Sequence, residues 1–127
     1  MRTSWVISLV LLVLTVAAGC YEETETRQLS ERYVSASQEL KIMAEIQAWP
    51  RAQETIDAYK ASWQQIVPWL QILINHDDID DVTLSLERIQ ATIEAQDLAS
   101  CIEACAELKE NARHIFHRDA FTLGNVL

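Results

Sequence analysis

Three histidines and a run of aspartates are the residues of this chain whose chemistry suits a ligand site. His76 directly precedes the acidic sequence that contains Asp78 and Asp80, and His114 follows late in the chain. Imidazole nitrogens and carboxylate oxygens bind divalent metal ions, and the same groups can act as general acids and bases. The candidate interaction or ligand patch therefore consists of His76, Asp78, Asp80 and His114.

The spacing of these residues argues against a metal site. At about 100° per residue, His114 points about 140° away from the apolar face that contains Cys101 on the same predicted helix. The acidic run also lacks the glycine and the terminal glutamate of a calcium-binding loop. We predict no metal and no other cofactor. Two alternatives to a metal site exist for this region. Arg113 and Arg118 can form an ionic patch with the aspartates, or the region can dock onto a membrane protein.

Cys101 and Cys105 lie four residues apart on the apolar face of one predicted helix. Their Cα atoms would be about 6 Å apart, which suits a disulfide, but the parallel side chains would strain the bond. We favour two reduced cysteines that pack as small hydrophobes, with a disulfide as the alternative. The serines lack His and Asp partners at a recognisable spacing, and no phosphate loop or nucleophile motif is present. We expect no enzymatic activity.

The N-terminal 20 residues have the layout of a secretory signal. Arg2 precedes an apolar run of 14 residues, Trp5 to Ala18. As a helix this run is about 21 Å long, which is short for a hydrocarbon core of about 30 Å. The ending Ala-Ala-Gly-Cys20 resembles the lipobox of bacterial lipoproteins, in which the cysteine becomes a diacylated N-terminus and can also carry palmitate. The alternatives are an uncleaved single N-terminal membrane helix, or ordinary secretion with a free Cys20.

This leader divides the chain into three predicted parts. Residues 1–19 form a lipoprotein-type signal peptide, residues 20–26 the lipidated cysteine and a tether, and residues 27–127 a helical domain. Removing 19 of the 127 residues leaves 108, with nine Lys and Arg against 19 Asp and Glu, so the mature net charge is −10. Such a charge repels nucleic acid and anionic lipid, and we therefore expect no nucleic-acid partner.

Four apolar-periodic segments follow the leader, and only two glycines and two prolines occur in the chain. The segments predict helices over about 26–47, from Pro50 to Leu73, from the acidic run at residue 77, and after Asp97 as an N-cap. Pro68 is expected to bend the second helix. The bend could open a pocket lined by Trp63 and Trp69, but we favour curvature around the core with Trp69 partly exposed. We expect residues 121–127 to fold back over the core. The predicted core residues are Leu29, Tyr33, Ala36, Leu40, Met43, Ala52, Ile56, Tyr59, Trp63, Ile66, Leu70, Leu73, Ile79, Val82, Leu86, Ile89, Ile93, Leu98, Cys101, Cys105, Leu108, Ala112 and Ile115.

The predicted fold class is all-α, an antiparallel up-down four-helix bundle after an N-terminal signal or anchor helix. Short connections force consecutive helices to lie antiparallel. The end of the second helix, the start of the third and the end of the fourth should then meet beside the leader. This topology places all three histidines at the membrane-facing end.

Several short motifs resemble the domain-of-unknown-function family 4363, whose members are small helical bacterial proteins with a hydrophobic N-terminal anchor. They are Asn-His-Asp-Asp-Ile-Asp at residues 75–80, Leu-Ser-Leu-Glu-Arg at 84–88, Asp97, Glu-Leu-Lys at 107–109, His-Ile at 114–115 and Thr-Leu-Gly-Asn-Val-Leu at 122–127. The chain differs from the family pattern with Asp78 for Glu, Thr122 for Ser and Val126 for Ile, and in its lipobox. The resemblance implies the fold and the membrane location, but no activity.

The leader and the helical domain together predict a membrane-tethered protein on the extracytoplasmic face of the cell membrane. We expect it to bind or scaffold another envelope protein. The alternative is a metal-binding or small-ligand-binding domain that uses the His76 end of the helices.

Overall fold

The structure is a computed structural model that describes the backbone of residues 2–126 and the side chains of residues 3–18 and 27–115. Within these residues the chain is all-helical, as the apolar periodicity predicted. The four helices are α1 (Arg2–Glu45), α2 (Trp49–Leu73), α3 (His76–Glu94) and α4 (Leu98–Val126). Only two or three residues connect each helix to the next.

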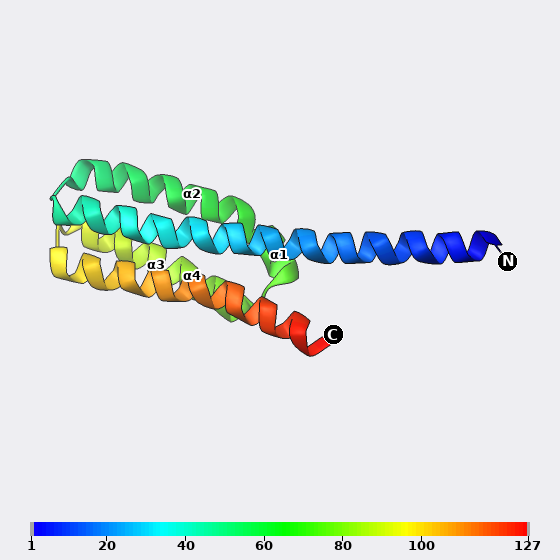
Figure 1. Cartoon of the computed structure of the whole chain (residues 1–127). Coiled ribbons are helices and arrows are strands. Elements are labelled where there is room, and N and C mark those ends of the chain that lie inside the picture. Colours follow the sequence, from blue (N-terminus) through cyan, green and yellow to red (C-terminus); the bar gives the residue numbers. More distant parts are fainter. Residues whose placement is uncertain (1, 127) are drawn as a thin grey trace.

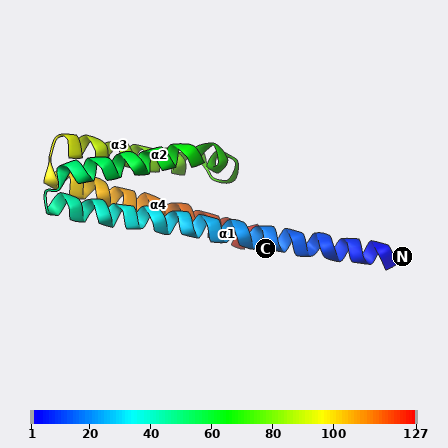
Figure 2. The same cartoon turned by 90° about the horizontal axis from the view of Figure 1, so that it is seen from above.

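The helices pack into one bundle from which the first half of α1 projects. Figure 1 shows the second half of α1 in one bundle with α2, α3 and α4, and the N-terminal half of α1 extending past them. Figure 2 shows the same arrangement from above, with α1 and α4 on one side and α2 and α3 on the other. α4 packs against both α1 and α3, and α2 packs against α3 and α1.

The core consists of the apolar faces that the sequence pattern predicted, with one error. All the predicted core residues of α3 are buried, and so are those of α4 from Cys101 to Ile115. Leu73 was wrongly predicted to be buried, because α2 ends there and the next residue, Ile74, takes the buried position. Tyr59, Ile66, Leu29, Met43 and Leu98 pack against the core and are partly buried.

The first and third turns reverse the chain without glycine. Gln47 follows α1 with φ 57°, and Gln96 follows α3 with φ 53°. At each turn the next residue donates its N–H to a carbonyl five residues earlier, Ala48 to Met43 at 2.9 Å and Asp97 to Thr92 at 3.0 Å. This pattern is the Schellman motif, which ends a helix through a left-handed residue. Two glutamines therefore adopt a conformation that favours glycine.

α2 continues through Pro68 as a single helix, although proline supplies no N–H to the preceding turn. Trp63 is buried in the core, whereas Trp69 is exposed. The two indoles therefore do not line a common pocket, and the packing interpretation is correct for Trp63. Pro50 lies in the first turn of α2, as predicted, where a missing N–H costs no helical hydrogen bond.

Trp63 is the centre of an aromatic cluster that joins three helices. Its ring meets that of Tyr33 edge-on, with centroids 5.1 Å apart, and Tyr33 meets Tyr59 at 6.0 Å. The Trp63 Nε1–H donates to Thr83 Oγ1 of α3 at 2.8 Å, and that hydroxyl donates to the Ile79 carbonyl at 2.9 Å. The indole is thus buried with its one polar group paired, which is the usual requirement for a core tryptophan.

Two expectations at the ends of the domain differ from the structure. The first helix was predicted to begin at about residue 26, but the backbone of residues 21–26 is already helical and continues α1 without a break. Residues 121–126, predicted to fold back, continue α4 instead. Neither segment contains proline, and the first contains no glycine, so backbone hydrogen bonding can propagate from the adjoining helix at little cost.

Candidate functional site

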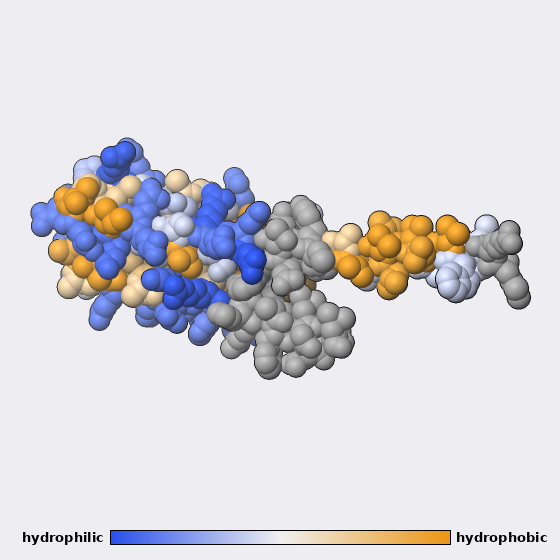
Figure 3. All heavy atoms as spheres, viewed as in Figure 1, coloured by the Kyte–Doolittle hydropathy of each residue, from blue (hydrophilic) through white to orange (hydrophobic). Residues whose placement is uncertain are grey.

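The first half of α1 exposes every large apolar side chain that it carries. Their exposed fractions lie between 51% at Val10 and 80% at Trp5, and Figure 3 shows them as an apolar rod outside the bundle. Among the residues that the structure describes, no helix has the combined length and hydropathy needed to cross a membrane. Cys20, the predicted lipidation site, lies in α1 by its backbone, but its side chain is outside the described residues.

The His/Asp patch lies at the end of the bundle from which the rod projects. Ser30 Oγ of α1 donates to the Ala112 carbonyl of α4 at 2.8 Å, and Asn111 Nδ2 of α4 donates to the Asp81 carbonyl of α3 at 3.2 Å. These contacts join the start of α3 and the later part of α4 to α1 close to its projecting half (Figure 1). The structure therefore brings His76 and His114 to the same end of the bundle.

The four side chains of this patch do not converge. His76, Asp80 and His114 are exposed, whereas Asp78 is buried in the first turn of α3. Within the described part of the chain, no group of three or more His, Cys, Asp or Glu side chains could hold a metal ion. His117, the third histidine, is outside the described side chains. The exposure of His114 agrees with the direction predicted from the helical wheel.

Helix caps explain the local order around the acidic run and at the start of α4. The Asn75 side chain accepts the Asp77 N–H at 3.3 Å, so α3 begins one residue earlier than the predicted acidic start. Asp97 caps α4 as predicted, since its carboxylate accepts the Ser100 N–H at 3.2 Å and the Ser100 hydroxyl at 2.7 Å. Both bonds lower the pKa of Asp97, and the bond from the Ser100 side chain has the larger effect.

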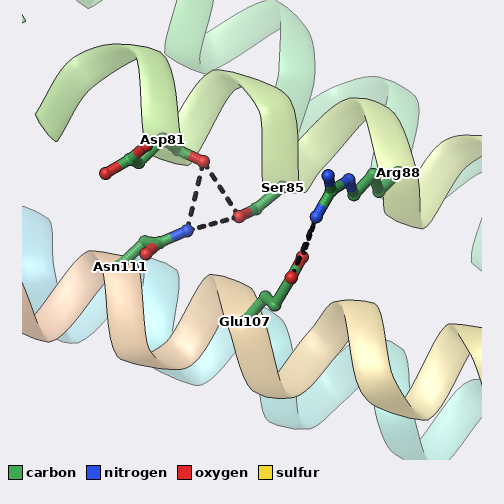
Figure 4. Close-up of polar contacts among 5 residues, drawn as sticks. All are labelled: Asp81, Ser85, Arg88, Glu107 and Asn111. Carbon is green, nitrogen blue, oxygen red and sulfur yellow. Dashed lines mark hydrogen bonds and ion pairs between the residues drawn. The ribbon is translucent and has the colours of Figure 1, made fainter. Parts of the chain in front are cut away.

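A polar cluster between α3 and α4 was not predicted. Asn111 Nδ2 donates to Ser85 Oγ at 2.7 Å and to the Asp81 carbonyl at 3.2 Å, and Ser85 Oγ donates to the same carbonyl at 2.9 Å (Figure 4). Ser85 is buried, and its hydroxyl both donates and accepts a hydrogen bond within the protein. The signal in the sequence was a serine between Val82 and Leu86 on a core-facing helix.

Arg88 and Glu107 form the ion pair that joins α3 to α4. One guanidinium nitrogen, Nη1, donates to both carboxylate oxygens, at 2.8 and 2.9 Å (Figure 4). Both side chains are about half exposed, so the pair contributes little to stability, up to about 1 kcal/mol. The sequence instead predicted an ionic patch in which Arg113 and Arg118 lie near the aspartates of the acidic run. The Arg118 side chain is outside the described residues.

A shallow groove of about 470 Å³ runs beside these contacts between α3 and α4. Three glutamates line this groove together with Arg88: Glu103, Glu107 and Glu110. Arg88 is already paired with Glu107, and the groove is open to solvent. Its chemistry is therefore that of a hydrated acidic surface.

Cys101 and Cys105 are both buried and both free. A side-chain hydrogen bond between them lowers the pKa of Cys101, and the same bond together with burial raises the pKa of Cys105. Burial shields both sulfurs from reagents in solution, so they pack as small apolar side chains in this structure.

The model of one protein family, the Domain of unknown function (DUF4363), matches residues 21–126. The chain belongs to this family. No curated protein and no solved structure matches the chain. The DUF4363 domain begins directly after Cys20, and it includes the second half of α1 and all of α2, α3 and α4.

The DUF4363 domain exposes large apolar side chains near both of its ends. Ile42 and Ile46, 59% and 69% exposed, lie on and just after the last turn of α1. Trp69, Ile72 and Leu73 lie on the last turns of α2, with exposed fractions of 72%, 77% and 53%. Of these residues only Trp69 was expected to be exposed. The type of an apolar residue next to a helical stripe does not show whether a neighbouring helix covers it.

Proposed function

We propose that this protein is a membrane-tethered, extracytoplasmic helical module that binds another envelope protein. The projecting half of α1 carries the proposal, because its large apolar side chains are exposed around the whole helix. Exposing such a surface to water costs about 25 cal/mol per Å² relative to burial. A bilayer removes this cost by burying the apolar run while it acts as a signal or anchor. After cleavage, the same bilayer buries the lipid on Cys20.

A lipid on Cys20 fits the dimensions of the leader better than a retained spanning helix does. The apolar run provides about 21 Å of helix for a hydrocarbon core of about 30 Å. Two acyl chains anchor a protein firmly, whereas one binds only marginally. We therefore place the mature N-terminus at Cys20, on the extracytoplasmic face.

We further propose that the helices form an antiparallel up-down four-helix bundle standing on this anchor. Paired residues support the alternation in direction. Arg88 bonds Glu107 while Ser85 bonds Asn111, so residue numbers rise along α3 as they fall along α4. In this topology α1 rises from the membrane, and its last turn lies at the far end of the bundle.

The partner surface is proposed at that far end, on Ile42 and Ile46. These side chains are one helical turn apart and therefore share a face of α1. From Cys20 to Ile46 the helix rises about 39 Å at 1.5 Å per residue. The expected partner is an envelope protein that presents apolar side chains about 35 to 40 Å above the lipid surface.

Photo-crosslinking in native membranes tests this proposal. A photoreactive amino acid at Gln38, exposed one turn before Ile42, should form one defined adduct with an envelope protein. The substitution Ile46→Ser should abolish that adduct, and the same label at exposed Glu87 on α3 should not form it. An adduct that persists in Ile46→Ser, or recovery of the protein only as a free monomer, would contradict the binding role.

A further inference from the structure

Trp69, Ile72 and Leu73 form one exposed apolar surface, called here the α2 patch. Their spacing of three and four residues places them on the same face of α2. Each is more than half exposed. Contiguous apolar surfaces of this kind mark sites of protein or membrane contact, whereas single exposed residues need no explanation.

The bundle has no room for this surface in its own core. Leu70 and Ile74 are the residues of this segment that are buried. Around the helix, Leu70 lies about 100° from Trp69 and about 160° from Ile72. The end of α2 thus has two apolar faces, one inside the bundle and one outside it. The outer face needs a partner beyond the core.

The position of the α2 patch along α1 identifies that partner. Arg32 Nη2 of α1 donates to Ser62 Oγ of α2 at 3.2 Å, and the rings of Tyr33 and Trp63 are in contact. Earlier on α2, the Tyr59 hydroxyl donates to Glu39 of α1 at 2.8 Å, so residue numbers fall along α1 as they rise along α2. Continuing this pairing places Trp69 level with residues 25–27 and Leu73 level with residues 21–23. All three patch residues therefore lie within about 10 Å of Cys20 along the helix axis. Figure 1 shows this end of α2 at the same level along the bundle as the point where α1 leaves it.

We propose that the α2 patch is a second membrane contact, which inserts into the interfacial layer of the bilayer that holds the tether. The proposal rests on the proposed function, because the tether sets the height of the patch. Apolar faces of peripheral helices bury about 5 to 10 Å into the boundary between headgroups and acyl chains. Tryptophan favours this layer because its ring is apolar and its N–H can remain hydrated.

Charge restricts the lipid to a zwitterionic one. No lysine or arginine occurs between Lys60 and Arg88, while Asp77 and Asp80 are exposed on the first turns of the next helix. The end of α2 and the start of α3 thus contain aspartates and no lysine or arginine, so this segment offers anionic headgroups no attraction. Insertion should therefore be driven by apolar burial and be insensitive to salt.

Fluorescence quenching in vesicles tests the contact. The protein is purified from membranes, where by the proposed function it begins at lipidated Cys20, and is reconstituted into phosphatidylcholine vesicles that carry bromine on acyl carbons close to the headgroups. Flotation of the vesicles reports the tether. Trp69→Phe should lose most of the quenching that the wild type shows. Trp49→Phe, at the opposite end of α2, is the matched control and should keep it. Trp5 is removed with the leader and does not contribute to the signal.

The outcomes separate the patch from the tether. Flotation with equal quenching in Trp69→Phe and Trp49→Phe would overturn the membrane contact and leave the tether standing. Failure of every protein to float would overturn the tether and the contact together. Quenching of Trp69 that requires phosphatidylglycerol and disappears in high salt would overturn the apolar mechanism. A double substitution, Ile72→Ser with Leu73→Ser, should reduce quenching of Trp69 while flotation is retained.

Discussion

Thr83→Val should destabilise the protein although valine has the same shape as threonine and is more apolar. Thr83 Oγ1 accepts the indole N–H of Trp63 at 2.8 Å, and valine removes this acceptor. Trp63 is only 1% exposed, so water cannot replace the lost bond. A buried donor left unpaired costs about 1 to 3 kcal/mol. We expect the free energy of unfolding to fall by about 2 kcal/mol.

Thr83→Ser is the matched control because it keeps the hydroxyl and removes a methyl group. The lost methyl is partly buried, and a fully buried CH₂ contributes about 0.8 kcal/mol, so serine should cost less than that. Urea unfolding, followed by circular dichroism, measures both variants. At about 4 °C per kcal/mol for a domain of this size, Thr83→Val should also lower Tm by about 8 °C.

A double-mutant cycle separates the hydrogen bond from general packing. In a Trp63→Phe background the donor is absent, so Thr83→Val should cost little, and the difference between the two backgrounds measures the coupling. The reasoning is refuted if Thr83→Val is as stable as the wild type or more stable than Thr83→Ser. That result would mean that apolar transfer, not the unpaired indole N–H, determines stability at this position.

Three further predictions concern a turn, a tyrosine and the cysteine pair. Gln47 has φ 57°, so Gln47→Gly should raise the free energy of unfolding by up to about 1 kcal/mol, whereas Gln47→Ala should not; equal effects in urea unfolding would contradict the left-handed turn. Burial raises the pKa of Tyr33 from 10.0 to about 12, so the unfolded chain loses this proton first and stability should fall as pH rises from 10 to 12. Tyr33→Phe should make that fall smaller, and an unchanged pH profile would contradict it. In Cys20→Ala, denaturation without reductant should expose two thiols to a thiol reagent, since Cys101 and Cys105 are free; a count of zero would indicate a disulfide.

The apolar faces of α3 and α4 were predictable because a period of 3.6 residues determines which positions share a side of a helix. Ile79 to Ile93 and Cys101 to Ile115 are buried along these faces. The same rule failed at Leu73, where the helix ends and Ile74 occupies the core position instead. Periodicity describes a continuous helix and contains no information about its last turn.

The contacts that join the helices could not be predicted from the sequence. The bond from Asn111 to Ser85 depends on how α3 and α4 are rotated and shifted relative to each other, which neither helix determines alone. The left-handed turns at Gln47 and Gln96 could not be predicted either, because glycine is the residue that usually marks such a position. The extension of α4 through residues 121–126 depends on continued backbone hydrogen bonding, which an apolar pattern does not predict.

Palmitate labelling of the wild type against Cys20→Ala, combined with membrane flotation, is the most direct test of the tether. The account predicts that the wild type incorporates label and floats with the membranes, and that Cys20→Ala incorporates none. Equal labelling of the two proteins, or recovery of the unlabelled wild type in the soluble fraction, would contradict the lipid tether.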